Sequence, residues 1–138
     1  MAESKIKLIK TWFEQCTLLK NGQINVDYLK GEKGAYSIEQ VPTNTNQSEF
    51  VDGRGGKRTI AFNFCVNAPI STQVLVNIAN SKFCEDFTKW VEDQNKAKNL
   101  PAIDGAFKIE CTSNGYLMQR TETMGTYIIQ MSFTYYEL

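Results

Sequence analysis

The sequence contains no histidine among its 138 residues, and its four cysteines are widely spaced without a C-x-x-C pair. Histidine is the commonest general acid or base near neutral pH, so its absence weakens most enzyme hypotheses. A zinc site of the usual mixed kind would also require histidine. The acidic side chains of residues 85–93 lie among lysines in a helical charge pattern and not in an apolar stretch, so they do not form a catalytic constellation. The sequence therefore predicts no metal, no cofactor and no catalytic site.

A net charge and long apolar runs are absent too. Fifteen basic residues balance fifteen acidic ones, so no global field draws the chain to nucleic acid or to an anionic membrane. The N-terminal stretch MAESKIKLIK lacks an apolar run of the length that a signal peptide or a membrane span requires. We therefore expect a reducing cytoplasm with free thiols, in which Cys16, Cys65 and Cys84 or Cys111 are small buried apolar residues.

The segment EFVDGRGGKRTIAFNF, residues 49–64, has the glycines and the lysine of a phosphate-binding loop but not their spacing. Gly53 and Gly56 enclose two residues where that motif needs four, and Arg58 occupies the Ser/Thr position. The residues that follow alternate with a period of two, which predicts a strand and not the required helix. We expect a basic loop in which Arg54, Lys57 and Arg58 are solvated, or are a candidate interaction site for an acidic partner or DNA.

Two regions have helical periodicity. In residues 4–20 apolar side chains recur at three- and four-residue steps, with Ser4 as the expected N-cap and residues 21–22, Asn-Gly, as the end. The second region begins with a cap at residue 71 or 72 and continues to about residue 98, with residues 80–81 as a point where it could divide into two helices. Trp12 and Trp90 lie near the apolar stripes, so we expect both in the core.

Period-two alternation predicts the strands of the first half. We expect strands at residues 24–28 and 36–41, which are candidates for a hairpin, and at residues 59–66. The segments 43–57 and 118–125 are long and polar for a compact domain, so we expect loops that are either functional or disordered.

The last third of the chain is β again. Residues 107, 109 and 111 alternate, a turn follows at residues 113–115, and the alternation resumes at residue 116 before a second turn near Gly125. In the final strand, residues 127–136, Tyr135 and Tyr136 point to opposite faces. We expect one α+β domain, residues 1–138, in the order α-β-β-β-α-β-β, with a mainly antiparallel sheet and helices packed on one face.

Seven stretches, in order along nearly the whole chain, resemble a family of small minor structural proteins of tailed bacteriophages that infect Gram-positive hosts. Members of this family are labelled minor capsid protein or tail terminator. The stretches are INVDYL (24–29), YSIEQVP (36–42), FVDG (50–53), NIANSKFCEDFTKWVEDQN (77–95), NLP (99–101), KIECTSNGYL (108–117) and YIIQMSFTYY (127–136).

The resemblance implies a tail-terminator-like fold and a structural, non-enzymatic role in the virion after synthesis in the host cytoplasm. Such a protein forms a ring, usually of six subunits, that caps the finished tail tube and joins it to the head connector. Its partners would be copies of itself, the tail tube protein, and connector or neck proteins, with a passing contact to DNA in the lumen and none to a membrane. A neck or head-completion protein of the same particle is the alternative.

A closed ring of identical subunits needs two different patches on each subunit. An exposed sheet edge is one source, because its unpaired N–H and C=O groups invite a neighbouring strand. The outward Tyr136 and the tail residues Glu137 and Leu138 are the candidate edge-strand interface. The long polar loops are the second source, and the basic residues of the first loop would pass close to DNA phosphates in the ring opening.

Overall fold

The computed structural model of the chain describes residues 4–19, 24–27, 35–41, 46–49, 56–70, 74–121 and 123–137. Within these ranges the fold is α+β, with two helices and a mostly antiparallel sheet of seven strands. The helices are α1 (Lys5–Phe13) and α2 (Val74–Lys96). The strands are β1 (Ile24–Val26), β2 (Tyr36–Val41), β3 (Asn46–Glu49), β4 (Gly56–Pro69), β5 (Ala106–Cys111), β6 (Tyr116–Arg120) and β7 (Met124–Glu137).

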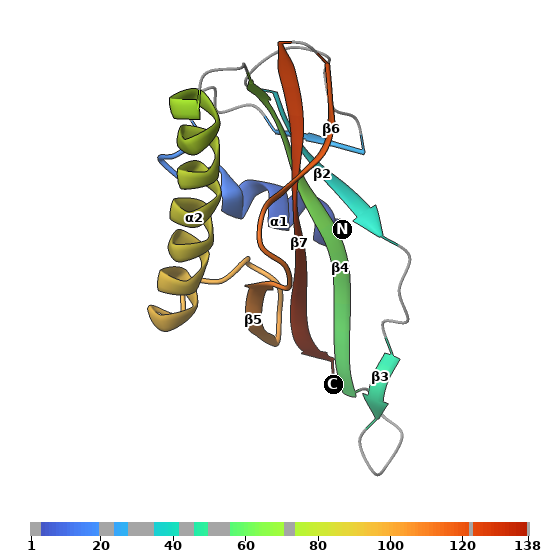
Figure 1. Cartoon of the computed structure of the whole chain (residues 1–138). Coiled ribbons are helices and arrows are strands. Elements are labelled where there is room, and N and C mark those ends of the chain that lie inside the picture. Colours follow the sequence, from blue (N-terminus) through green and yellow to red (C-terminus); the bar gives the residue numbers. More distant parts are fainter. Residues whose placement is uncertain are drawn as a thin grey trace.

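The centre of the sheet is the antiparallel pair β4 and β7, which are the longest strands in Figure 1. Each has 14 residues, and they pair along their full length, from Gly56 opposite Glu137 to Pro69 opposite Met124. The alternation that predicts these two strands is confirmed, since Phe62, Phe64 and their even-numbered neighbours face the core. The strand β4 begins at residue 56, so the loop predicted over residues 43–57 ends earlier than expected.

Two shorter strands flank this central pair on each side. On one side β2 lies opposite residues 61–66 of β4, and β3 lies opposite residues 56–58. On the other side β5 lies opposite residues 131–135 of β7, and β6 lies opposite residues 125–128. The structure thus has two strands more than the predicted order. The strand β3 occupies part of the polar segment predicted as a loop, because pairing to a long neighbour gives polar residues a ladder that periodicity does not reveal. The strand β6 begins at residue 116, where the alternation was predicted to resume, and continues into the second predicted loop.

The predicted hairpin of the first two strands is wrong. The strands β1 and β2 pair in parallel, with Ile24 beside Tyr36 and Val26 beside Ile38. Asp27 follows β1 in a left-handed conformation, with φ 54°, and its N–H donates to the carbonyl oxygen of Ile38 at 2.8 Å. A period of two identifies a strand, but it does not state in which direction the neighbouring strand runs.

Both helices pack on the same face of the sheet, called here the inner face. The ring of Phe13 in α1 lies 5.2 Å from that of Phe64 in β4, and the ring of Phe87 in α2 lies 4.5 Å from Phe64. Phe13, Phe64 and Phe87 are fully buried, so one aromatic cluster joins both helices to the sheet. Figure 1 shows α2 standing beside the long β4–β7 pair. The predicted packing of helices on one face is confirmed.

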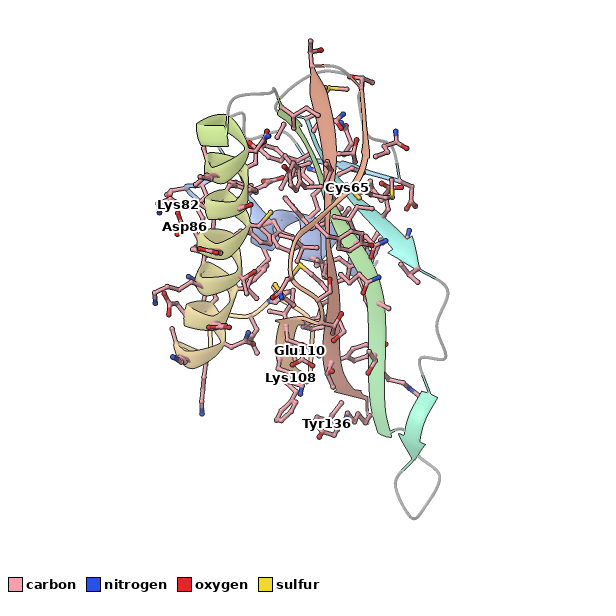
Figure 2. All side chains as sticks on the ribbon, viewed as in Figure 1. Cys65, Lys82, Asp86, Lys108, Glu110 and Tyr136 are labelled. Carbon is pink, nitrogen blue, oxygen red and sulfur yellow. The ribbon has the colours of Figure 1, made fainter. Side chains whose placement is uncertain are left out.

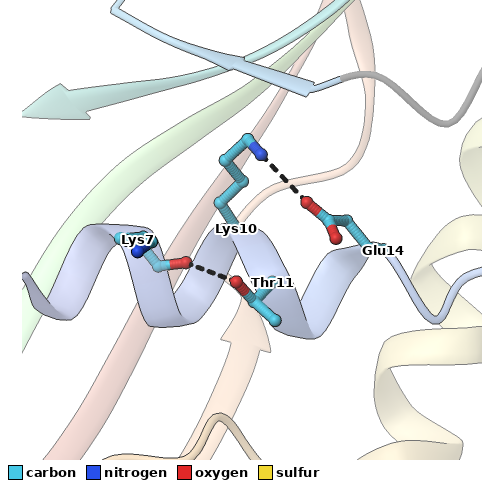
Figure 3. Close-up of polar contacts among 4 residues, drawn as sticks. All are labelled: Lys7, Lys10, Thr11 and Glu14. Atoms are coloured by element: carbon cyan, nitrogen blue, oxygen red, sulfur yellow. Dashed lines mark hydrogen bonds and ion pairs between the residues drawn. The ribbon is translucent and has the colours of Figure 1, made fainter. Parts of the chain in front are cut away.

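The helix α1 is shorter than predicted, because it ends at Phe13 and not at residue 20. Ser4 is at the N-cap position, but its side chain makes no capping hydrogen bond. The residues after Phe13 form turns, yet Cys16 and Leu19 are buried, which explains why the helical pattern continues past the helix. Figure 3 shows the exposed side of α1, where Lys10 pairs with Glu14 at 2.9 Å and the Thr11 hydroxyl donates to the Lys7 carbonyl at 3.0 Å.

The helix α2 continues unbroken through residues 80–81, so of the two alternatives that the sequence leaves open the single helix is correct. The predicted cap at residue 71 or 72 lies outside the described residues. Lys82 and Asp86 form an ion pair of 2.8 Å on the exposed side of α2, as Figure 2 shows. Trp12 is buried and its Nε1 donates to the carbonyl oxygen of Asn99 at 2.8 Å, just after the end of α2. The Trp12 and Trp90 rings are 4.8 Å apart, so the predicted core role of both residues is confirmed.

Candidate interaction surfaces

The basic residues of the predicted loop do not form one loop site. Lys57 and Arg58 belong to β4, where Lys57 lies opposite Tyr136 and Arg58 lies opposite Tyr135. Both side chains are half-buried. Arg54 lies outside the described residues. Since successive side chains of a strand point to opposite faces, Lys57 and Arg58 cannot act together on one partner surface.

The predicted edge-strand interface is not on an edge. The strand β7 is paired with β4 on one side and with β5 and β6 on the other. The N–H of Tyr136 donates to the carbonyl oxygen of Gly105 at 2.9 Å, and Glu137 lies opposite Gly56. Leu138 lies outside the described residues. A partner can therefore meet Tyr136 through its side chain but not through an open backbone.

An exposed aromatic pair lies at the end of the sheet where the C-terminus lies, on the outer face opposite the helices. The rings of Phe107 and Tyr136 meet edge to face at 5.4 Å, with 53% and 37% of these residues exposed. Figure 2 shows Tyr136 near Lys108 at this end. We call Phe107 and Tyr136 the C-terminal aromatic patch.

Phe107 was expected on the same face as Ile109 and Cys111. A bulge between Ala106 and Lys108 changes the register of β5 against β7, and the extra residue turns Phe107 outward. Tyr135 is buried while Tyr136 is exposed, as their alternation predicts. The aromatic patch was missed because a single sequence gives no sign of a bulge.

The strand β6 carries a second exposed apolar group. Tyr116, Leu117 and Met118 follow one another and are 41%, 39% and 51% exposed. One side of β6 pairs with β7, and in the described ranges no strand pairs with its other side. We call these three residues the β6 patch. Consecutive exposed apolar residues on an unpaired edge are unusual unless they bind something.

The neighbouring edge of β5 is closed by a side chain. The carboxamide of Asn95 in α2 accepts from the Ile109 N–H at 2.9 Å, and its Nδ2 donates to the Ile109 carbonyl oxygen. The same Nδ2 also donates to the Val91 carbonyl oxygen at 3.0 Å. Asn95 thus takes the place of one residue of a neighbouring strand, so β5 offers no open backbone at Ile109.

The edge of β2 is closed at the backbone N–H of Gln40. The two carboxylate oxygens of Asp27 accept from the backbone N–H and from Nε2 of Gln40, at 2.9 and 2.8 Å. These hydrogen bonds lower the pKa of Asp27, the backbone one most strongly, because both stabilise the charged form. Nothing in the sequence pattern predicts either closure, since each joins segments that are far apart in the chain.

Two shallow clefts lie between α2 and the β5–β6 side of the sheet. One, of about 370 Å³, is lined by Asn95, Ile109 and Cys111, among others. The other, of about 530 Å³, is lined by Cys84, Tyr127 and the 114–115 segment, among others. Burial raises the pKa of the Cys84 and Cys111 thiols to about 11. Both thiols are therefore protonated at neutral pH and are poor nucleophiles.

The remaining cysteines have similar chemistry. All four thiols are free, and Cys16, Cys65 and Cys84 are buried, as predicted. The Cys65 thiol donates to Oε2 of Glu39 at 2.9 Å. Burial, with that hydrogen bond, raises the pKa of Cys65 strongly.

Across the described residues, no group of three or more His, Cys, Asp and Glu side chains could hold a metal ion. In the same part of the chain, neither helix has the length and hydrophobicity that crossing a bilayer requires.

Comparison with known protein families and with curated proteins finds no match for this chain.

Proposed function

We propose that this chain is a structural virion protein: a tail terminator that forms a ring, caps the tail tube of a bacteriophage and joins it to the head connector. The proposal starts from the ordered resemblance of its sequence stretches to that family. One structural observation supports it most: the C-terminal aromatic patch and the β6 patch are separate exposed apolar groups on one sheet. A ring on a tube requires each subunit to have separate contact surfaces of this kind.

The arrangement of the layers fits this role. Both helices cover the inner face, and no helix of the described ranges lies on the outer face. The aromatic patch is at one end of that outer face. In protein interfaces, aromatic side chains are among the residues that most often dominate the binding energy. We assign this patch to the contact with the tail tube.

The test is to add the purified chain to its cognate tail tube protein during tube polymerisation and to image the tubes by electron microscopy. A terminator stops growth and leaves an additional ring of density at one tube end. Tubes of unchanged length with unmodified ends, at a saturating concentration of the chain, contradict the proposal. Binding to the head connector or portal alone indicates a neck or head-completion protein.

A further inference from the structure

The strands β1 and β6, on opposite borders of the sheet, lie at the two ends of one row of residues that pair across the sheet. Asn25 of β1 lies beside Ser37 of β2, Ser37 lies opposite Cys65 of β4, and Cys65 lies opposite Ile128 of β7. Ile128 in turn lies opposite Tyr116 of β6. The strands β1 and β6 are therefore at the same height on opposite borders.

The directions of these strands are also suitable for pairing. The strand β1 runs parallel to β2, which is antiparallel to β4. The strand β6 is antiparallel to β7, and β7 is antiparallel to β4, so β6 runs parallel to β4. Two copies in the same orientation, side by side, would place β6 of one copy antiparallel to β1 of the next.

The other parts of both borders are less available. Asn95 closes β5 at Ile109, and Asp27 closes β2 at Gln40. The strand β3 lies opposite residues 56–58 of β4, at the other end of the sheet from β6. In the described residues, no strand pairs with the outer side of β1 or of β6. At the height of β6, the border that can continue the sheet is thus β1.

We propose that β6 of one copy pairs antiparallel with β1 of a second copy, so that the sheets of neighbouring subunits become continuous around the ring. The occupant is a second copy because the same chain supplies both open borders at one height. The pairing buries the β6 patch and satisfies the backbone groups on both edges. It is heterologous, so each subunit keeps one open border until the ring closes. This inference deepens the proposed function and rests on it for the number of subunits.

The test uses two cysteines that face each other only in this pairing. Asn25 and Tyr116 are on the same face at the two ends of the row, and neither is buried. Directly opposite residues of antiparallel strands have Cβ atoms about 4.5–5.5 Å apart, so mild oxidation can join them after small adjustments. The chain carrying Asn25→Cys and Tyr116→Cys is oxidised and run on a non-reducing denaturing gel. Wild-type chain and both single variants are oxidised in parallel, because four native thiols are present.

Heterologous pairing predicts a ladder of multiples of 15.7 kDa in the double variant and monomers in each single variant. Dimers that form with Tyr116→Cys alone would indicate β6 against β6 and overturn the proposal. Absence of a ladder in the double variant also overturns it.

Light scattering gives a second readout that does not depend on disulfide geometry. Met118→Lys places a charge on the β6 edge and is expected to weaken self-association at least about tenfold. Ile78→Lys is the matched control, since it changes an equally exposed residue of α2 that belongs to neither patch, and it should leave the mass unchanged. Equal effects of the two variants, or a wild-type chain that is monomeric at every concentration, contradict the edge pairing. A monomeric chain that still caps tubes would overturn this inference and leave the proposed function standing.

Discussion

The side-chain amide of Asn95 holds both backbone groups of Ile109, 14 residues further along the chain. This contact fastens the C-terminal part of α2 to β5 and closes the sheet border at that point. Because Asp27 accepts from the backbone N–H of Gln40 on the other border, the fold leaves β6 and β1 as the open edges at one height.

Replacing Asn95 by alanine should destabilise the protein by about 1–3 kcal/mol, because the N–H and C=O of Ile109 lose their partner in a partly buried place. Asn95→Asp keeps an acceptor for the N–H but loses the donor, so it should be destabilising as well. Urea denaturation measures both. The control is Lys96→Ala, at the neighbouring exposed position, which should change the free energy of unfolding by less than about 0.5 kcal/mol. Equal stability of Asn95→Ala and Lys96→Ala would show that the pairing contributes nothing.

Gly105→Ala should destabilise the end of β7 that carries the aromatic patch. Gly105 has φ +79°, and a Cβ atom there would collide with the carbonyl oxygen of Tyr136. Positive φ and a backbone collision act together, so we expect a loss of at least about 2 kcal/mol in the free energy of unfolding. Asp104→Ala changes the preceding exposed residue and should be nearly neutral. A thermal melt compares the two variants, and coincident melts would refute the collision.

Alkaline pH should weaken the fold through its buried thiols. Burial raises the pKa of Cys84 and Cys111 from 9.0 to about 11, so the folded state favours the neutral thiols. Their contribution is complete below the unfolded pKa and is lost as the pH rises from about 9 through about 11. The urea midpoint should therefore decrease over this range. The decrease should be smaller in the Cys84→Ala, Cys111→Ala double variant, in which Cys16, Cys65, the lysines and the tyrosines still titrate. Identical decreases would exclude Cys84 and Cys111 as a cause.

Phe107→Ala should weaken binding to the tail tube, if the proposed function is right, by about 30-fold or more, which is about 2 kcal/mol. The residue is 53% exposed, so the free energy of unfolding should change by less than about 1 kcal/mol. Ile78→Ala is the control, because Ile78 is 55% exposed but lies in α2, away from the patch. Co-sedimentation with preformed tubes measures the affinity. Equal binding by the two variants would remove the aromatic patch from the tube contact.

Much of the fold can be predicted because burial on one side of an element leaves a periodic signal. The alternation of β4 and β7, the apolar stripes of both helices and the burial of Trp12 are local patterns of this kind. The same signal misleads at the end of α1, where Cys16 and Leu19 keep a helical spacing although their backbone forms turns. It is silent on β3, whose residues are polar and whose strand exists through its pairing with β4.

The candidate surfaces could be predicted far less well. Tyr136 is exposed as expected, but its strand is in the interior of the sheet. Phe107 belongs to the aromatic patch because of a one-residue bulge, and Asn95 closes β5 through a contact between distant segments. Bulges and long-range closures depend on which segments meet, and a single sequence does not contain that information in its periodicity.

By itself, the sequence determined that this chain has an α+β fold with free buried thiols, because composition and period report which side of each segment avoids water. Tertiary structure alone decided that β1 runs parallel to β2, that β7 is central, and that β6 and β1 end the same row on opposite borders. The physical reason is that strand direction, register and edge closure are set by hydrogen bonds between distant segments.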